Sequence, residues 1–156
     1  MDVSIIKAEN KHLNDCIIAL QKSELGRIYF STENKALNAI SEGMGKGEIS
    51  VAINGDNIVL GFMWIIENGV FHSFPYLHIV AVKEEFRGLG IGREFLNYME
   101  RVCNSSKLFL VVADFNTGAK KFYIKNGFKE VGRIPDLYKN GVTEFLMMKE
   151  LQGKKL

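Results

Sequence analysis

The stretch that decides the fold runs from Tyr76 to Val102 and reads YLHIVAVKEEFRGLGIGREFLNYMERV. An apolar run typical of a strand comes first, a glycine-rich loop follows, and apolar residues then recur at helical spacing. The three alternating glycines let the backbone turn tightly and present successive N–H groups, and the start of the helix adds its positive dipole end. The sequence therefore predicts a loop that holds a phosphorylated ligand.

The rest of the chain predicts short strands and helices on either side of this stretch. The expected strands are 3–7, 48–53, 58–66, one ending at 82, 107–113, 129–134 and 142–149, with turns at 54–56 and 68–69. The expected helices are 11–25, one from about 32 to the glycines at 43–47, 91–102 and 117–126. This order implies an α/β fold with a mixed, mostly antiparallel twisted sheet, a central parallel pair and helices on both faces.

Composition sets broad limits on the class of protein. The chain has 156 residues, 47% of them apolar, which is enough for one compact core, so we expect a single domain over 1–156. The net charge of +2 comes from scattered residues and does not indicate a nucleic-acid surface. Two cysteines without metal-type spacing predict neither a disulfide nor a zinc site. Because no apolar stretch is long enough for a membrane span or signal peptide, we expect a cytoplasmic location.

The glycine loop does not match two well-known nucleotide motifs. A dinucleotide-binding loop would need a glycine three residues after Gly90, where Arg93 stands. A P-loop would need Lys-Ser or Lys-Thr after Gly92, where Arg93 and Glu94 follow. A turn with no ligand is the remaining alternative, and the flanking strand and helix argue against it.

The pattern Arg87-x-x-Gly90-x-Gly92 after an apolar strand resembles the acetyl-CoA pyrophosphate loop of the GNAT (Gcn5-related N-acetyltransferase) superfamily. A second block resembles the family's Asn-x-x-Ala-x-x-Phe-Tyr-x-x-x-Gly-Phe signature. Its matching residues are Asn116, Ala119, Phe122, Tyr123, Gly127 and Phe128. The resemblance covers about residues 49–151, and the earlier residues match only in the order of their elements.

The resemblance implies acetyl-CoA as the co-substrate and no metal. By analogy with the family, the pyrophosphate would be held mainly by backbone N–H groups of the loop, namely those of Arg87, Gly88, Leu89, Gly90, Ile91 and Gly92. The backbone of Val80 and Val82 would pair with the pantetheine arm and polarise the thioester carbonyl. Asn116 would contact the arm; alternatively, it caps the following helix.

Two side chains are candidates for proton transfer. Tyr123 matches the family tyrosine that protonates the leaving thiolate, although at this helical spacing it could also be a core aromatic. His78 could take the proton of the amine near neutral pH. A hydrogen-bonded core histidine is an equal alternative for His78, and Glu67 and His72 are rival bases.

The expected function is transfer of an acetyl group from acetyl-CoA to a primary amine by direct attack. The acceptor would be a protein or peptide N-terminus or a small amine, and segments 26–30 and 70–76 could line its pocket. A CoA-binding sensor or interaction module without turnover is the rival from another class, and transfer of a longer acyl group is a second. A homodimer could form through an exposed edge strand such as the C-terminal one.

Overall fold

A computed structural model describes residues 1–153, and the chain falls into two compact units. Unit 1 comprises residues 1–65 and 79–101, and unit 2 comprises 66–78 and the residues from 102 onward. The strands hydrogen-bond in the order β1-β2-β3-β4-β5-β7-β6. The β4–β5 pair is parallel, whereas β1–β2, β2–β3, β5–β7 and β6–β7 are antiparallel. The mixed sheet with a parallel pair is as predicted.

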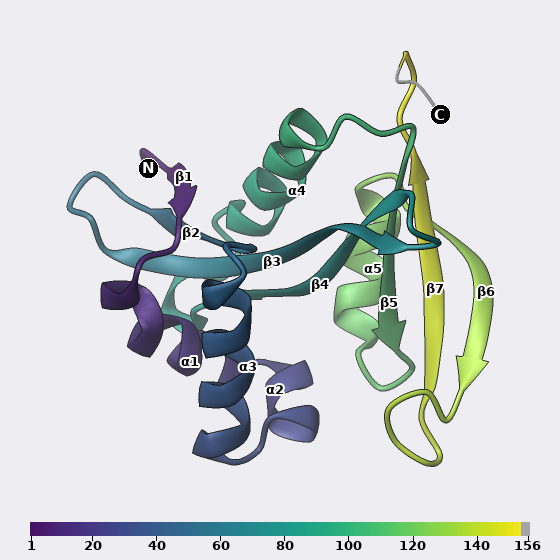
Figure 1. Cartoon of the computed structure of the whole chain (residues 1–156), viewed down its shortest axis with the longest axis horizontal. Helices are drawn as coiled ribbons and strands as arrows, with labels where there is room; N and C mark the ends of the chain where they lie inside the picture. The colour runs from purple at the N-terminus through teal and green to yellow at the C-terminus, as the bar shows by residue number, and fades with distance from the viewer. Residues whose placement is uncertain (154–156) are drawn as a thin grey trace. The chain divides into compact units, whose positions relative to one another are not determined.

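Unit 1 contains the N-terminal strands, most of the helices and the glycine loop. Its elements are β1 (Ser4–Lys7), η1 (Asn10–His12), α1 (Leu13–Gln21), α2 (Glu24–Tyr29), α3 (Glu33–Gly45), β2 (Ile49–Ile53), the first part of β3 (Val59–Val70), the last part of β4 (Phe74–Val82), η2 (Glu84–Phe86) and α4 (Ile91–Val102). Helices α1 and α3 lie side by side (Figure 1). Apolar side chains from these elements form the core, including Leu20, Ile40, Phe62, Phe95 and Met99.

The helix predicted over 11–25 is wrong in its extent, because α1 ends at Gln21 and a separate helix, α2, begins at Glu24. Ser23 makes the break. Its hydroxyl donates to the carbonyl of Leu20 at 2.6 Å and accepts from the backbone N–H of Gly26 at 2.9 Å. A Cβ on Gly26 would lie 1.6 Å from the Leu20 oxygen, so the chain can turn this closely only with glycine there.

The turn predicted at 68–69 is also wrong, because β3 continues through both residues to Val70. The chain reverses instead at Phe71 and His72, whose φ angles are 54° and 57°. A Cβ on Gly69 would lie 2.7 Å from the Cβ of Tyr76. Glycine is needed at position 69 because Tyr76 packs closely against it within the hairpin. The turn itself is formed by two non-glycine residues in the left-handed region.

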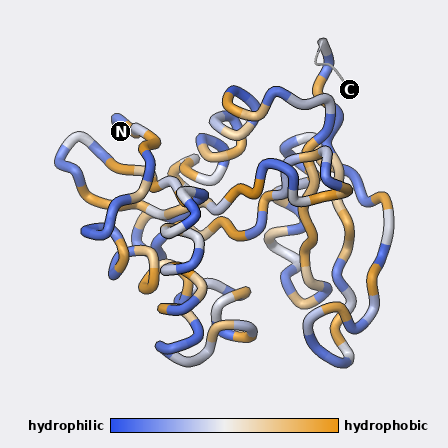
Figure 2. Tube along the Cα trace, viewed as in Figure 1, coloured by the Kyte–Doolittle hydropathy of each residue, from blue (hydrophilic) through white to orange (hydrophobic). Residues whose placement is uncertain are grey.

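Unit 2 is built on the remaining strands and one helix: β5 (Lys107–Ala113), α5 (Thr117–Lys125), β6 (Lys129–Pro135) and β7 (Thr143–Glu150), with the adjoining ends of β3 and β4. Strand β5 pairs with β7 from Lys107↔Glu150 to Ala113↔Glu144 (Figure 1). Figure 2 shows the hydrophobic run along β5, most of which is buried. The lack of polar alternation along it is typical of a strand that is covered on both faces.

The C-terminal strand is not an edge strand, contrary to expectation. It lies between β5 and β6, so β1 and β6 are the two edges of the sheet. Among residues 1–153, no helix is both long and apolar enough to span a bilayer.

Candidate functional site

The glycine loop has the conformation that its sequence predicts. Gly88 and Gly90 have φ angles of 78° and 85°, in the left-handed region that glycine enters at little cost. The carbonyl of Gly90 accepts from the N–H of Glu94 at 3.1 Å, which marks the start of α4. The first N–H groups of a helix have no acceptor within it, so those that follow Gly90 are available to an anion at the positive end of the helix dipole. Gly92 lies inside the first helical turn.

The Arg87 side chain joins this loop to two neighbouring segments of unit 1. Its Nε donates to the carbonyl of Val82 at 3.2 Å, and its Nη2 donates to the carbonyl of Lys22 at 2.9 Å. The guanidinium therefore hydrogen-bonds to the protein backbone. The part of the loop that is open to a ligand is the backbone, with Gly88, Leu89 and Gly90 exposed.

Along β4, buried and half-buried residues alternate. Val80 and Val82 are half-buried, whereas Ile79 and Ala81 are buried on the opposite face. Strand β3 passes very close to the end of β4, because a Cβ on Gly61 would lie 2.5 Å from the carbonyl oxygen of Ala81. The backbone of this part of β4 is therefore fixed on the β3 side by close packing.

In unit 2, the side chains of Tyr76 and His78 lie on one face of β4. Their ring centroids are 5.8 Å apart. The hydroxyl of Tyr76 lies 3.4 Å from the hydroxyl of Tyr138, a residue of the β6–β7 connection that is 55% exposed. The rival bases differ from His78 in burial, because Glu67 and His72 are exposed while His78 is half-buried.

Tyr123 lies on α5 and is 8% exposed. Its ring packs edge-on against Phe122 and Phe128, at centroid distances of 5.4 and 5.7 Å. Tyr123 therefore packs as a core aromatic does, and its part in proton transfer stays a prediction. Burial also raises the pKa of Tyr123 above its usual range, and the hydroxyl stays protonated at neutral pH. A protonated buried phenol remains able to act as an acid.

Asn116 is the N-cap of α5, where its side-chain oxygen accepts from the N–H of Ala119 at 3.4 Å. The capping interpretation is therefore confirmed, and contact with a cofactor arm stays a prediction. Among residues 1–153, no group of three or more His, Cys, Asp or Glu side chains could hold a metal ion.

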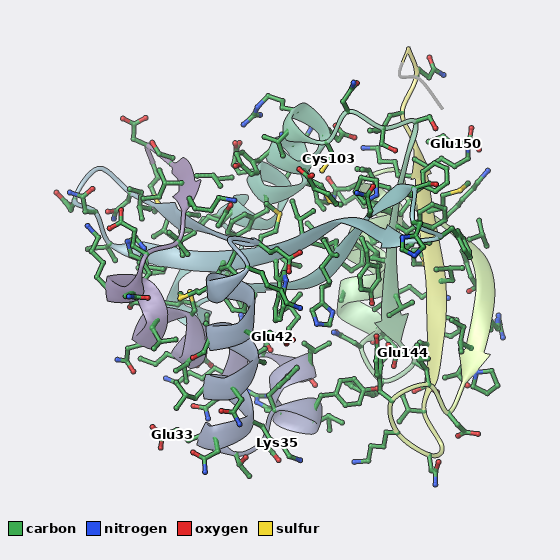
Figure 3. The ribbon with its side chains drawn as sticks, viewed as in Figure 1. Glu33, Lys35, Glu42, Cys103, Glu144 and Glu150 are labelled. Carbon is green, nitrogen blue, oxygen red and sulfur yellow. The ribbon has the colours of Figure 1, made fainter. Side chains whose placement is uncertain are left out.

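Glu144 was not predicted from the sequence; it is 1% exposed and lies on β7 opposite Ala113 (Figure 3). Residues paired directly across strands point to the same face, and side chains alternate along a strand. Tyr76 pairs with Phe109, and Ala113 lies four residues after Phe109, so Glu144 shares the face of Tyr76 and His78. The available signal was one carboxylate directly before the apolar run 145–148 of this strand.

Electrostatic interactions connect these residues of unit 2. Burial is the main cause that raises the pKa of Tyr76 above its usual range, followed by the hydrogen bond with Tyr138 and then by interactions with Tyr138, Glu144 and Tyr123. The candidate acid Tyr123 and the buried carboxylate Glu144 are thus both near enough to act on Tyr76. These residues lie close together within unit 2, and the glycine loop lies within unit 1.

Residues 45–130 match the family model described as the acetyltransferase (GNAT) domain, and this range is more than half of the chain. The chain belongs to the GNAT acetyltransferase family. The match includes the glycine loop of this GNAT domain and the Asn116–Phe128 block. The resemblance expected from these two motifs is confirmed.

Two relatives of this GNAT chain carry N-acetyltransferase names. It is 36% identical over 84 residues to an uncharacterized N-acetyltransferase of Methanocaldococcus jannaschii, with 50% of this chain and 54% of that protein covered. It is 38% identical over 72 residues to an N-alpha-acetyltransferase of Sulfurisphaera tokodaii, with 44% and 43% covered. The matches thus span about half the length of these relatives or less.

A solved structure agrees in fold. The crystal structure of a GNAT-family acetyltransferase from Bacillus cereus superposes with a TM-score of 0.77 at 21% identity, covering 97% of this chain and 100% of that one. At this identity the likeness bears on the fold alone, and it agrees with the predicted GNAT fold.

Proposed function

We propose that this chain transfers the acetyl group of acetyl-CoA to a primary amine by direct attack of the amine on the thioester. The observation that carries the proposal is the loop with Gly88 and Gly90 in left-handed conformations immediately before α4. This backbone suits the pyrophosphate of CoA, because it presents N–H groups at the positive end of a helix dipole.

Backbone groups would hold the donor. The N–H groups of 87–92 would bind the pyrophosphate, and β4 backbone at Val80 and Val82 would pair with the pantetheine arm and polarise the thioester carbonyl. The side-chain amide nitrogen of Asn116 would reach the same arm, because its oxygen caps α5. The bound acetyl-CoA supplies the activated acyl group.

Two side chains would move protons. His78 would take a proton from the attacking amine, and Tyr123 would give its proton to the departing thiolate. A neutral phenol is the form that this step needs, and burial keeps Tyr123 in that form. The phenol regains its proton from the nitrogen as the amide forms. His78 releases to solvent the proton that it took from the ammonium form of the amine, so both side chains end the turnover as they began it.

Direct attack is favoured over an acyl-enzyme intermediate. The chain has two cysteines, and both are buried. Burial raises the pKa of Cys16 to about 12 and that of Cys103 to about 11, so neither supplies a thiolate at neutral pH. A cysteine nucleophile would need an environment that lowers the pKa of its thiol.

The acceptor would be a peptide N-terminus or a small primary amine. The name of the Sulfurisphaera tokodaii relative supports an α-amino group as the first acceptor to test. The aromatic segment 70–76, with Phe71 and Phe74 packed edge-on against Phe109, offers an apolar wall for the acceptor. We also propose a cytoplasmic location, where acetyl-CoA is available.

The test measures release of free CoA thiol from acetyl-CoA with a panel of peptides and small amines, together with heat unfolding with and without acetyl-CoA. An acceptor that raises thiol release well above background supports the enzyme. Protection against heat without turnover on any acceptor would instead support the CoA-binding sensor. If acetyl-CoA gives no protection against heat and no acceptor is turned over, the donor site itself is rejected.

A further inference from the structure

Asn-Gly pairs occur at four places in this chain, at 54–55, 68–69, 126–127 and 140–141. Such a pair can modify itself, because the backbone nitrogen of the glycine can attack the side-chain amide carbon of the asparagine and close a five-membered ring. Glycine favours this step, since it has no Cβ to obstruct the approach and its backbone reorients freely. The proposed acetyl transfer uses none of these four asparagines.

The first pair lies in the turn between β2 and β3 (Figure 1). Asn54 is half-buried, and Gly55 is exposed. Among residues 1–153, the N–H of Gly55 donates to no acceptor, and a Cβ on this glycine would meet no atom within 4 Å. The nitrogen that must attack is therefore not engaged in a hydrogen bond, and the space beside it is open.

Two backbone N–H groups hold the side-chain oxygen of Asn54. Those of Asp56 and Ile58 donate to its Oδ1 at 3.0 and 2.9 Å. Ring closure places negative charge on this oxygen, because attack at the amide carbon converts the C=O bond to a single bond. Donors that are already in place stabilise such a charge, as they do in an oxyanion hole. The two hydrogen bonds therefore favour attack on this amide.

The other three pairs lack this combination. The N–H of Gly127 donates to the carbonyl of Ile124 at 3.1 Å, so the attacking nitrogen of that pair is engaged. The N–H of Gly141 donates to Oδ1 of Asp136 at 2.7 Å, with the same consequence. Gly69 lies within strand β3, where the backbone is extended and fixed in the sheet.

We propose that Asn54 is a site of spontaneous deamidation and the first of the four asparagines to react. As the Gly55 nitrogen loses its proton to solvent, it forms a bond to Cγ of Asn54, and the bond from Cγ to the side-chain nitrogen breaks. That nitrogen takes up a proton and leaves as ammonia. Water then opens the cyclic imide at one of its two carbonyls. The sum is asparagine plus water giving aspartate or isoaspartate plus ammonia.

The products change the turn in two ways. Each event adds one negative charge close to the exposed side chain of Asp56. When the imide opens at the main-chain carbonyl, the product is isoaspartate, and the backbone then runs through Cγ and is longer by one methylene group. The carbonyl of Asn54 accepts from the N–H of Asn57 at 3.0 Å. In isoaspartate this carbonyl is no longer part of the main chain, so the turn has to rearrange.

The test incubates the full chain for several days in mildly alkaline buffer and maps its peptides by mass spectrometry, which detects exchange of NH₂ for OH at each asparagine. We expect Asn54 to react at least about tenfold faster than the asparagine of any other pair, a ratio that corresponds to a barrier lower by about 1.4 kcal/mol. Gly55→Ala is the matched variant, because the φ of Gly55 is not in the left-handed region and the added methyl group meets no atom. It should slow the reaction about tenfold, since the methyl group obstructs ring closure.

A second variant tests the part played by the attacking N–H group. Asp136→Gly removes the carboxylate that accepts from Gly141, and glycine suits the φ of 55° at this position. Asn140 should then react several times faster than in wild type, whereas the rate at Asn54 should be unchanged. Circular dichroism establishes that each variant is folded.

Three results would overturn the inference. A rate at Asn54 that is no higher than at Asn68 would show that the hydrogen bonds to Oδ1 protect the amide. An unchanged rate at Asn140 in Asp136→Gly would show that engagement of the glycine N–H does not decide which pair reacts. Loss of the Asn54 amide at the wild-type rate in Gly55→Ala would indicate direct hydrolysis in place of ring closure. All three are independent of acetyl transfer.

Discussion

The guanidinium of Arg87 joins the glycine loop to the C-terminal end of α1, where its Nη2 donates to the carbonyl of Lys22 at 2.9 Å. Its Nε holds the carbonyl of Val82, the last residue of β4, at 3.2 Å. One side chain therefore fixes the loop to two elements that precede it. We infer that the loop is held in its binding conformation before a ligand arrives, which lowers the cost of ordering it on binding.

Arg87→Ala should weaken binding of acetyl-CoA about three- to tenfold, because two charge-assisted hydrogen bonds to the backbone, each worth roughly 1 kcal/mol at this exposed position, are lost. Titration calorimetry measures the affinity. Arg101→Ala, in the last turn of α4, is the control and should bind acetyl-CoA as wild type does. Unchanged affinity in Arg87→Ala would show that the loop keeps its conformation without these two hydrogen bonds.

Gly90→Ala tests the backbone conformation of the loop. The φ angle of Gly90 is 85°, and a Cβ would meet no atom within 4 Å, so the substitution introduces strain without a clash. We expect the free energy of unfolding to fall by about 1–2 kcal/mol, the usual cost of a left-handed non-glycine residue. Affinity for acetyl-CoA should fall at least about tenfold, because relief of the strain turns the N–H groups away from the pyrophosphate.

Gly118→Ala is the matched control for that loop variant. Gly118 lies in the first turn of α5, and a Cβ there also meets no atom within 4 Å, but its φ is not in the left-handed region. It should stabilise the chain by about 0.5–1 kcal/mol, since alanine loses less entropy in a helix than glycine. Urea unfolding of both variants measures the contrast, and equal effects would refute the role assigned to the Gly90 backbone.

Tyr123→Phe should lower kcat by about 10² or more and leave acetyl-CoA affinity unchanged, because it removes an acid and keeps the ring that packs on Phe122 and Phe128. Since burial raises the pKa of Tyr123, the wild-type rate should show no alkaline loss due to this group up to about pH 10, its unperturbed value. Steady-state kinetics against pH measures both effects. A variant as fast as wild type would leave Tyr123 a packing residue only.

Stability should decline at alkaline pH. Burial raises the pKa of Cys16 to about 12, with a further increase from Asp15 and a decrease from Lys83. Burial and Glu67 raise that of Cys103 to about 11. Both values exceed the 9.0 of a free thiol, so the stabilisation is complete below pH 9 and is lost as the pH rises toward 11 and 12, where the unfolded chain holds fewer protons than the folded one.

Urea unfolding at pH 8 and pH 10.5 measures this effect. Cys16→Ala and Cys103→Ala should each reduce the difference in unfolding free energy between the two pH values, whatever their effect at pH 8. If the pH dependence of the unfolding free energy is unchanged in both variants, the loss of stability at alkaline pH comes from other groups.

The strand, glycine loop and helix of residues 76–102 could be predicted because their signals are local. Apolar residues recur at strand and then helical spacing, and glycine marks the left-handed positions. The break between α1 and α2 was missed because its cause is the close approach of Gly26 to the Leu20 carbonyl. The hairpin at Phe71 and His72 was misplaced because Gly69 accommodates Tyr76 within the hairpin instead of forming the turn.

The same difference between local signals and long-range contacts applies to the residues of the candidate site. Tyr123 and the loop could be named from the sequence because they lie in motifs with fixed spacing. Glu144 could not, because its significance depends on the register of β5 with β7 and of β4 with β5. A single carboxylate near the end of a chain has no local pattern that distinguishes a buried site residue from a solvated one.

The measurement that tests the central claim most directly follows an isotope-labelled acetyl group from acetyl-CoA in a single turnover with an acceptor found in the panel. Mass spectrometry of acceptor and protein, with thiol release measured in parallel, shows where the label goes. The account predicts one labelled acetyl group on the acceptor's amine per thiol released and none on the protein. Label on the protein, or thiol release with no labelled acceptor, would contradict direct transfer to an amine.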